Sequence, residues 1–123
     1  AEPCEFAPAA LKLASPVEVA ALPGFPEGEV SVQDAAAQLA APLLGAGPGM
    51  RVLDACAAPG GKACQVLEAV PGLAALVAVE IDAARARRIH DNLERLGLRA
   101  EVVVGDATRP SGWWDGRPFD RIL

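Results

Sequence analysis

The 123-residue sequence is poor in the residues that mark secreted, membrane-spanning and metal-binding proteins. Its cysteines, Cys4, Cys56 and Cys64, are odd in number and lack a Cys-x-x-Cys spacing, which argues against a disulfide framework and a zinc site. The longest clear apolar run, Leu73 to Val79, is far too short to span a bilayer, and no signal peptide opens the chain. These absences predict a cytoplasmic protein with reduced thiols, no metal and no membrane partner.

Aromatic residues make up only 4% of the chain, whereas 52% of its residues are hydrophobic. A core of Ala, Leu and Val is therefore expected, in one domain at most. The net charge of −5 argues against this segment as the main RNA-binding surface, because phosphate binding requires clustered Lys and Arg. Arg85, Arg87 and Arg88 do cluster, but four acidic residues flank them, which is typical of a solvated helix face.

The stretch Asp54 to Lys62, Asp-Ala-Cys-Ala-Ala-Pro-Gly-Gly-Lys, is the most informative part of the sequence. It follows an apolar run at 50–53 that predicts a buried strand and precedes residues 63–70, which predict a helix. A small-residue loop in this position leaves backbone N–H groups free at the positive end of the helix. The pattern predicts a binding site for an anionic ligand group.

This loop differs from two familiar nucleotide-binding loops. A phosphate-binding P-loop would need Gly and Ser or Thr where this chain has Cys56 and Ala63. A dinucleotide-binding loop would need three spaced glycines, but only the adjacent pair Gly60-Gly61 is present. The spacing therefore predicts a Rossmann-like ligand loop and makes a nicotinamide-dependent oxidoreductase a weaker alternative.

Further strands are predicted at 76–81, at 101–104 and from 119, with a helix at 83–96 between the first two. Glu80 lies at the end of a strand, 19 residues beyond Gly61, where Rossmann-like folds place a carboxylate that binds ribose hydroxyls. Asp82 competes for this role but is better placed as the N-cap of the following helix. Asp106 follows the next strand, so we expect it at the same ligand-binding edge of the sheet.

The N-terminal third of the chain has weaker patterns. Residues 1–28, rich in proline and turn sequences, predict an extended or linker-like lead-in, and residues 29–32 predict a short strand. A helix is expected at 33–44, with Asp34 as its N-cap and Gly45 as its stop. Pro42 should kink or end this helix near residue 40.

The stretch Asp54 to Lys62 resembles the first motif of the RNA cytosine-5 methyltransferases of the Nol/Nop/Sun family. Upstream, Ala-Leu-Pro-Gly-Phe at 21–25 and Val-Ser-Val-Gln-Asp at 30–34 resemble the bacterial 16S ribosomal RNA branch, the Sun or Fmu type. The resemblance implies an α/β fold: a parallel Rossmann-like class I methyltransferase sheet with helices on both faces. It further implies that residues 29–123 are the N-terminal part of the methyltransferase domain. The rest of that domain is then expected beyond the start of a fourth strand, where this sequence stops.

The resemblance also implies a cofactor, S-adenosylmethionine, and a partner, 16S ribosomal RNA. The residues predicted to bind the cofactor are Cys56, Ala57, Ala58, Pro59, Gly60, Gly61, Lys62, Glu80 and Asp106. No catalytic residue is predicted, because the family's nucleophilic cysteine belongs beyond Leu123 and Cys56 lies inside the cofactor loop.

An unfinished sheet should also favour self-association. A non-catalytic cofactor-binding or RNA-assembly module is the alternative from another class, and the presence of paired cysteines after Leu123 would decide against it.

Overall fold

The computed structural model describes residues 1–5 and 7–123, and a parallel sheet forms its centre. The four strands of this sheet are β3 (Arg51–Asp54), β4 (Ala75–Glu80), β5 (Glu101–Val104) and β6 (Arg121–Ile122), in the spatial order β5-β4-β3-β6. All neighbouring strands are parallel. The predicted α/β class with a Rossmann-like parallel sheet is confirmed.

The two central strands, β3 and β4, are apolar on both faces, as expected for strands covered from both sides. Val52 and its partner Leu76 are buried in the same core cluster as the helices. Leu53 and its partner Val77 belong to a second cluster on the opposite face. The alternation of the pleat therefore gives the sheet two separate cores.

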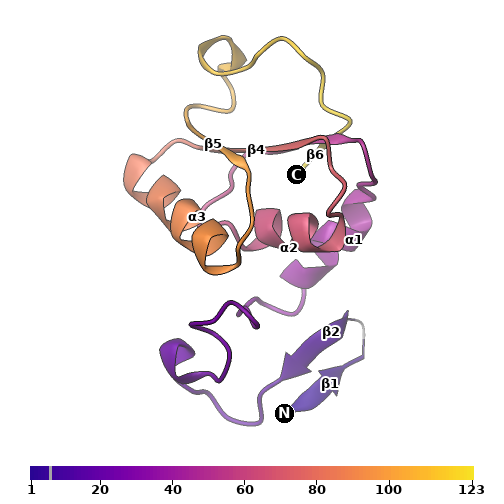
Figure 1. Ribbon diagram of the computed structural model, residues 1–123, viewed down its shortest axis with the longest axis vertical. Helices are drawn as coiled ribbons and strands as arrows, with labels where there is room; N and C mark the ends of the chain where they lie inside the picture. Colours follow the sequence, from indigo (N-terminus) through magenta and orange to yellow (C-terminus); the bar gives the residue numbers. More distant parts are fainter. Residues whose placement is uncertain (6) are drawn as a thin grey trace.

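The three α-helices of the described residues, α1 (Ala40–Leu44), α2 (Gly61–Ala69) and α3 (Ala83–Arg95), lie on one face of the sheet (Figure 1). Their buried residues include Val66 and Ile89. The opposite face is covered by the segment between β5 and β6 and not by the helix expected there. This segment contains only the 3₁₀ turn η3 (Pro110–Gly112), and it packs Trp113 and Phe119 on the sheet.

The helix predicted at 33–44 forms in two parts, the 3₁₀ turn η2 (Ala37–Leu39) followed by α1. Asp34, predicted as the N-cap, lies two residues before the actual N-cap, Ala36. It instead holds the turn that leads into the helix, since its Oδ1 accepts from Ala36 N at 2.9 Å and from Ala37 N at 3.3 Å. The helix changes from 3₁₀ to α at residue 40, close to the kink or end predicted there, but Pro42 itself lies in the first turn of α1, where a missing N–H costs little. Gly45 ends α1 with φ of +62°, as predicted.

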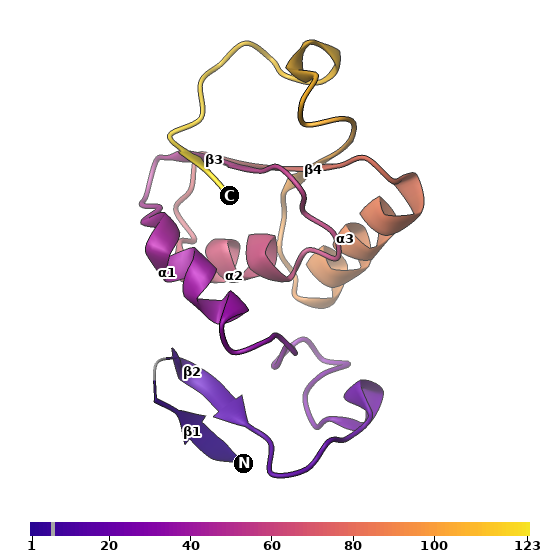
Figure 2. The same ribbon diagram turned by 180° about the vertical axis from the view of Figure 1, so that it is seen from behind.

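The N-terminal region forms an antiparallel hairpin of β1 (Glu2–Cys4) and β2 (Ala7–Lys12), followed by the 3₁₀ turn η1 (Val19–Ala21). Figure 2 shows the hairpin beyond the helical layer, away from the sheet. The sequence predicted extended chain here, but it did not predict that the two strands would pair. The division into a lead-in at 1–28 and a domain at 29–123 stays a prediction.

The strand predicted at 29–32 is wrong, because these residues form no ladder with another strand among the described residues. Their polar backbone groups are bonded in other ways. Glu29 N donates to Gly24 O at 2.8 Å, closing a turn. Val30 O instead accepts from the Arg95 side chain at 3.0 Å.

Candidate functional site

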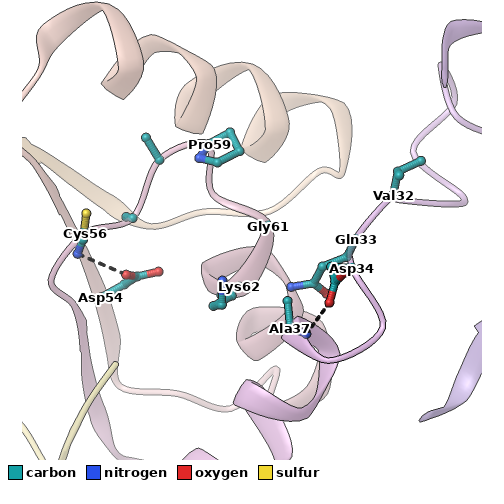
Figure 3. A pocket seen from close by; sticks show the side chains of 11 residues that line it. Val32, Gln33, Asp34, Ala37, Asp54, Cys56, Pro59, Gly61 and Lys62 are labelled. Atoms are coloured by element: carbon teal, nitrogen blue, oxygen red, sulfur yellow. Dashed lines mark hydrogen bonds between the residues drawn. The ribbon is translucent and has the colours of Figure 1, made fainter. Parts of the chain in front are cut away.

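A pocket of about 250 Å³ opens where the loop after β3 faces the segment before η2 (Figure 3). Figure 3 shows Asp54 and Cys56 on one side and Gln33 and Asp34 on the other, with Lys62 between them. The residues that line it are Val32, Gln33, Asp34, Ala37, Asp54, Cys56, Ala57, Ala58, Pro59, Gly61 and Lys62. The pocket thus brings together most of the predicted loop with a wall that lies about 20 residues earlier in the chain.

The loop is shaped by backbone hydrogen bonds and by Gly60. Ala57 N donates to Val79 O at 3.1 Å, which ties the loop to the end of β4. Gly60 has φ of +100°, and a Cβ there would lie 3.3 Å from Ile89, so glycine suits both the turn and the close approach of α3. Helix α2 then begins at Gly61, and no described side chain caps it. Its first N–H groups are left for water or a ligand, as the sequence predicted.

Glu80 is only 1% exposed and does not line the pocket. Its Oε2 accepts from Ala58 N at 3.3 Å, and its Oε1 accepts from Asp82 N at 3.2 Å. The half-exposed Arg85 guanidinium lies 3.5 Å from Oε1. Glu80 therefore anchors the pocket loop to the end of β4. Its predicted contact with ribose stays a prediction.

Asp54 is a pocket residue that was not among the predicted cofactor ligands. It is 5% exposed, and Cys56 N donates to its Oδ1 at 3.4 Å. Burial raises the pKa of Asp54 above 3.8, while the Cys56 N–H and the Lys62 ammonium oppose the rise. A cation in the pocket would favour its ionised form. The sequence could have predicted Asp54 as a pocket residue, because it ends β3 at the sheet edge for which Glu80 and Asp106 were predicted as cofactor ligands.

Asp106 follows β5 and does not line the pocket. Its Oδ1 accepts from Thr108 Oγ1 at 2.7 Å and from Thr108 N at 2.9 Å. These bonds lower the pKa of Asp106, with the hydroxyl as the largest cause and with Arg109 contributing. Asp106 is thus an ionised carboxylate at the same edge of the sheet, and its predicted role in binding the cofactor stays a prediction.

The pocket wall opposite the loop includes Gln33, which by composition alone reads as an ordinary surface residue. The Gln33 Nε2 atom lies 3.9 Å from the position that a Cβ on Gly61 would occupy. Any side chain at Gly61 would therefore begin to fill the space between the two walls. Asp34 also lines the wall, where its carboxylate already holds the turn that leads into the helix.

The two cysteines near the site differ in their surroundings. Cys56 is exposed and lines the pocket. Cys64 is buried, and this burial, together with nearby Glu68, raises the pKa of its thiol to about 11. Cys64 is therefore a protonated core residue at neutral pH.

Residues 1–5 and 7–123 contain no group of three or more His, Cys, Asp or Glu side chains placed to hold a metal ion. Within the same residues, no helix has the length and apolar character needed to cross a bilayer.

Comparison with known protein families gives one match over residues 41–123, to the family described as 16S rRNA methyltransferase RsmB/F. Among similar curated proteins are the ribosomal RNA small subunit methyltransferases B of Pseudomonas syringae pv. tomato and Pseudomonas putida. They are 56% and 54% identical to this chain over all of its 123 residues. The chain spans 28% of the length of each of these relatives.

Solved structures show the same fold. A methyltransferase homologue from Pyrococcus horikoshii superposes with a TM-score of 0.77 and 27% identity, over 89% of this chain and 35% of its own. NSun6 from Pyrococcus horikoshii, solved with SFG, superposes with a TM-score of 0.79 and 25% identity, over 87% of this chain and 28% of its own. The resemblance noted in the sequence is confirmed.

Proposed function

The chain belongs to the RsmB/F family of 16S rRNA methyltransferases, and from this membership we propose that it forms the S-adenosylmethionine-binding part of a longer rRNA cytosine-5 methyltransferase. The observation that carries the proposal is the pocket built by the motif from Asp54 to Lys62 at the start of α2. Support also comes from NSun6, which was solved with SFG, an analogue of this cofactor.

The chemical groups of S-adenosylmethionine suit those of the pocket. Its carboxylate fits the uncapped N-terminus of α2, where the helix dipole and the free N–H groups favour an anion. The ammonium group next to this carboxylate fits Asp54, the buried carboxylate of the pocket. We assign the ribose and adenine to the sheet edge that carries Glu80 and Asp106. Bound there, the cofactor would supply an activated methyl group.

The residues of this chain would bind and orient the cofactor and keep water from its covered side. In the chemistry that we propose for the complete protein, a cysteine thiolate adds to C6 of the cytosine ring and C5 takes the methyl group, which leaves the cofactor as S-adenosylhomocysteine. A base then removes the C5 proton, and the electrons of that C–H bond restore the C5–C6 double bond as the thiolate is released. We place the nucleophile outside residues 1–123, because Cys4 lies in the N-terminal hairpin and does not line the pocket, Cys56 lies in the cofactor loop and Cys64 is a buried, protonated thiol.

Ribosomal RNA would be bound chiefly by other regions of the complete protein. The complete protein would act in the cytoplasm. The net charge of −5 gives these residues no attraction for phosphates as a whole.

Titration calorimetry on the complete protein tests the proposal. S-adenosylmethionine should bind and NAD should not. Gly61→Val should weaken cofactor binding at least tenfold, because the new side chain enters the pocket toward Gln33, at a position whose backbone tolerates it. Gly112→Val is the matched control, since a side chain there meets open space. Unchanged affinity in a folded Gly61→Val protein would remove this pocket as the cofactor site.

A further inference from the structure

One wall of the pocket comes from a segment with almost no regular structure. Between η1 and η2, residues 22–36 form turns and irregular chain, yet Val32, Gln33 and Asp34 in this stretch line the pocket. Such a segment needs contacts from elsewhere in the fold to hold a fixed distance from the ligand loop.

Arg95, at the end of α3, provides contacts of this kind. Its Nη1 donates to Phe25 O at 2.9 Å and to Val30 O at 3.0 Å, and its Nη2 donates to Ser31 Oγ at 3.1 Å. Its guanidinium carbon lies 4.1 Å from the centre of the Phe25 ring. The chain also passes close behind it, because a Cβ on Gly28 would lie 2.2 Å from Arg95 O. Arg95 thus holds the segment that leads directly into the pocket wall.

Asn92, one turn earlier on α3, holds the other side of the pocket. Its Nδ2 donates to Pro59 O at 2.9 Å, in the ligand loop. Its Oδ1 accepts from Arg95 Nη2 at 3.4 Å. A continuous series of contacts therefore runs from the ligand loop, through Asn92 and Arg95, to the segment before Val32. Neither Asn92 nor Arg95 itself lines the pocket.

We propose that Arg95 and Asn92 are positioning residues that set the separation of the two pocket walls and thereby the affinity for the cofactor. This inference rests on the proposed function, since it takes the ligand to be S-adenosylmethionine. Arginine is required because its planar group donates in several fixed directions at once while stacking on Phe25. A lysine offers a single compact ammonium and cannot reproduce this set of contacts.

The test uses the complete protein with two substitutions, Arg95→Lys and Asn92→Asp. Asn92→Asp keeps an oxygen that accepts from Arg95, removes the donor to Pro59 O and puts a negatively charged oxygen that repels Pro59 O in its place. Arg99→Lys and Asp91→Asn serve as matched controls at exposed positions near the end of α3 and on α3. The measurements are the dissociation constant for S-adenosylmethionine by calorimetry and the hydrogen exchange of residues 22–37 and of β4.

We expect both substitutions to raise the dissociation constant about tenfold, corresponding to roughly 1.4 kcal/mol. Arg95→Lys should also speed amide exchange in residues 22–37 and leave β4 protected, whereas both controls should match the unaltered protein. Unchanged affinity in both variants would overturn the inference, as would faster exchange throughout β4, which would indicate general destabilisation. A failure of the unaltered protein to bind S-adenosylmethionine would instead count against the proposed function.

Discussion

Removing the carboxylate of Glu80 should loosen the ligand loop and destabilise the fold together. Glu80 accepts from Ala58 N in the loop and from Asp82 N at the start of α3, and its side chain is fully buried. In Glu80→Ala both N–H groups lose their acceptor. Neither N–H donates to any other acceptor among the described residues.

The size of the effect follows from these two contacts. A hydrogen bond to a charged group contributes about 1.5–3 kcal/mol to stability. The distances of 3.3 and 3.2 Å are at the long end for such bonds, so the lower value applies to each. The loss should be about 3 kcal/mol in total. The pair with Arg85, a half-exposed side chain, adds less than about 1 kcal/mol. Glu80→Gln, which keeps one acceptor, should lose about half as much.

Urea unfolding of the complete protein measures the stability, and calorimetry measures the affinity for S-adenosylmethionine. We expect the affinity of Glu80→Ala to fall ten- to a hundredfold, whereas Asp82→Ala should affect it less. An unfolding free energy equal to that of the unaltered protein would refute the anchoring argument. Unchanged cofactor affinity in a folded Glu80→Ala protein would separately rule out the predicted ribose contact.

Four further predictions concern other parts of the chain. Burial raises the pKa of Asp54 above 3.8, so the contribution of Asp54 to stability should be lost as the pH rises from 3.8 through the raised value. Asp54→Asn should therefore be more stable than the unaltered protein at pH 7 in urea unfolding, and a difference that persists below pH 3.8 would contradict this. Gly60→Ala should cost about 1–3 kcal/mol, because φ is +100° and Ile89 is close, while Gly112→Ala should be neutral in the same experiment. Cys56→Ser should leave methyl transfer to 16S rRNA measurable in the complete protein, since the thiol is assigned to the cofactor loop; abolished transfer with cofactor binding intact would make Cys56 the nucleophile. Residues 1–123 alone should self-associate through the sheet edge at β6, where Ile122 is 64% exposed, and sedimentation as a monomer would refute this.

The sequence by itself determined the centre of the fold, because the signals there are local. Apolar runs predicted β3, β4 and β5 to within one residue at each end, and Asp82 was predicted correctly as the N-cap of α3, where it accepts from Ala84 N at 2.7 Å. The sequence also predicted that the motif from Asp54 to Lys62 would form a loop between a buried strand and a helix, and it joins β3 to α2 in this way; its role in binding the cofactor stays a prediction.

The tertiary structure alone decided what lies around that loop. The pairing of β1 with β2, the absence of a regular strand at 29–32 and the loop that covers the second face of the sheet all depend on partners that no local pattern reveals. Asp54 and Glu80 are both buried carboxylates at strand ends, yet only Asp54 lines the pocket, whereas Glu80 anchors the loop from behind. The sequence analysis assigned no role to Arg95, yet its side chain donates to Phe25 O and Val30 O across separations of 70 and 65 residues. Contacts over such distances form only when packing brings the segments together, so periodicity and spacing along the chain contain no signal for them.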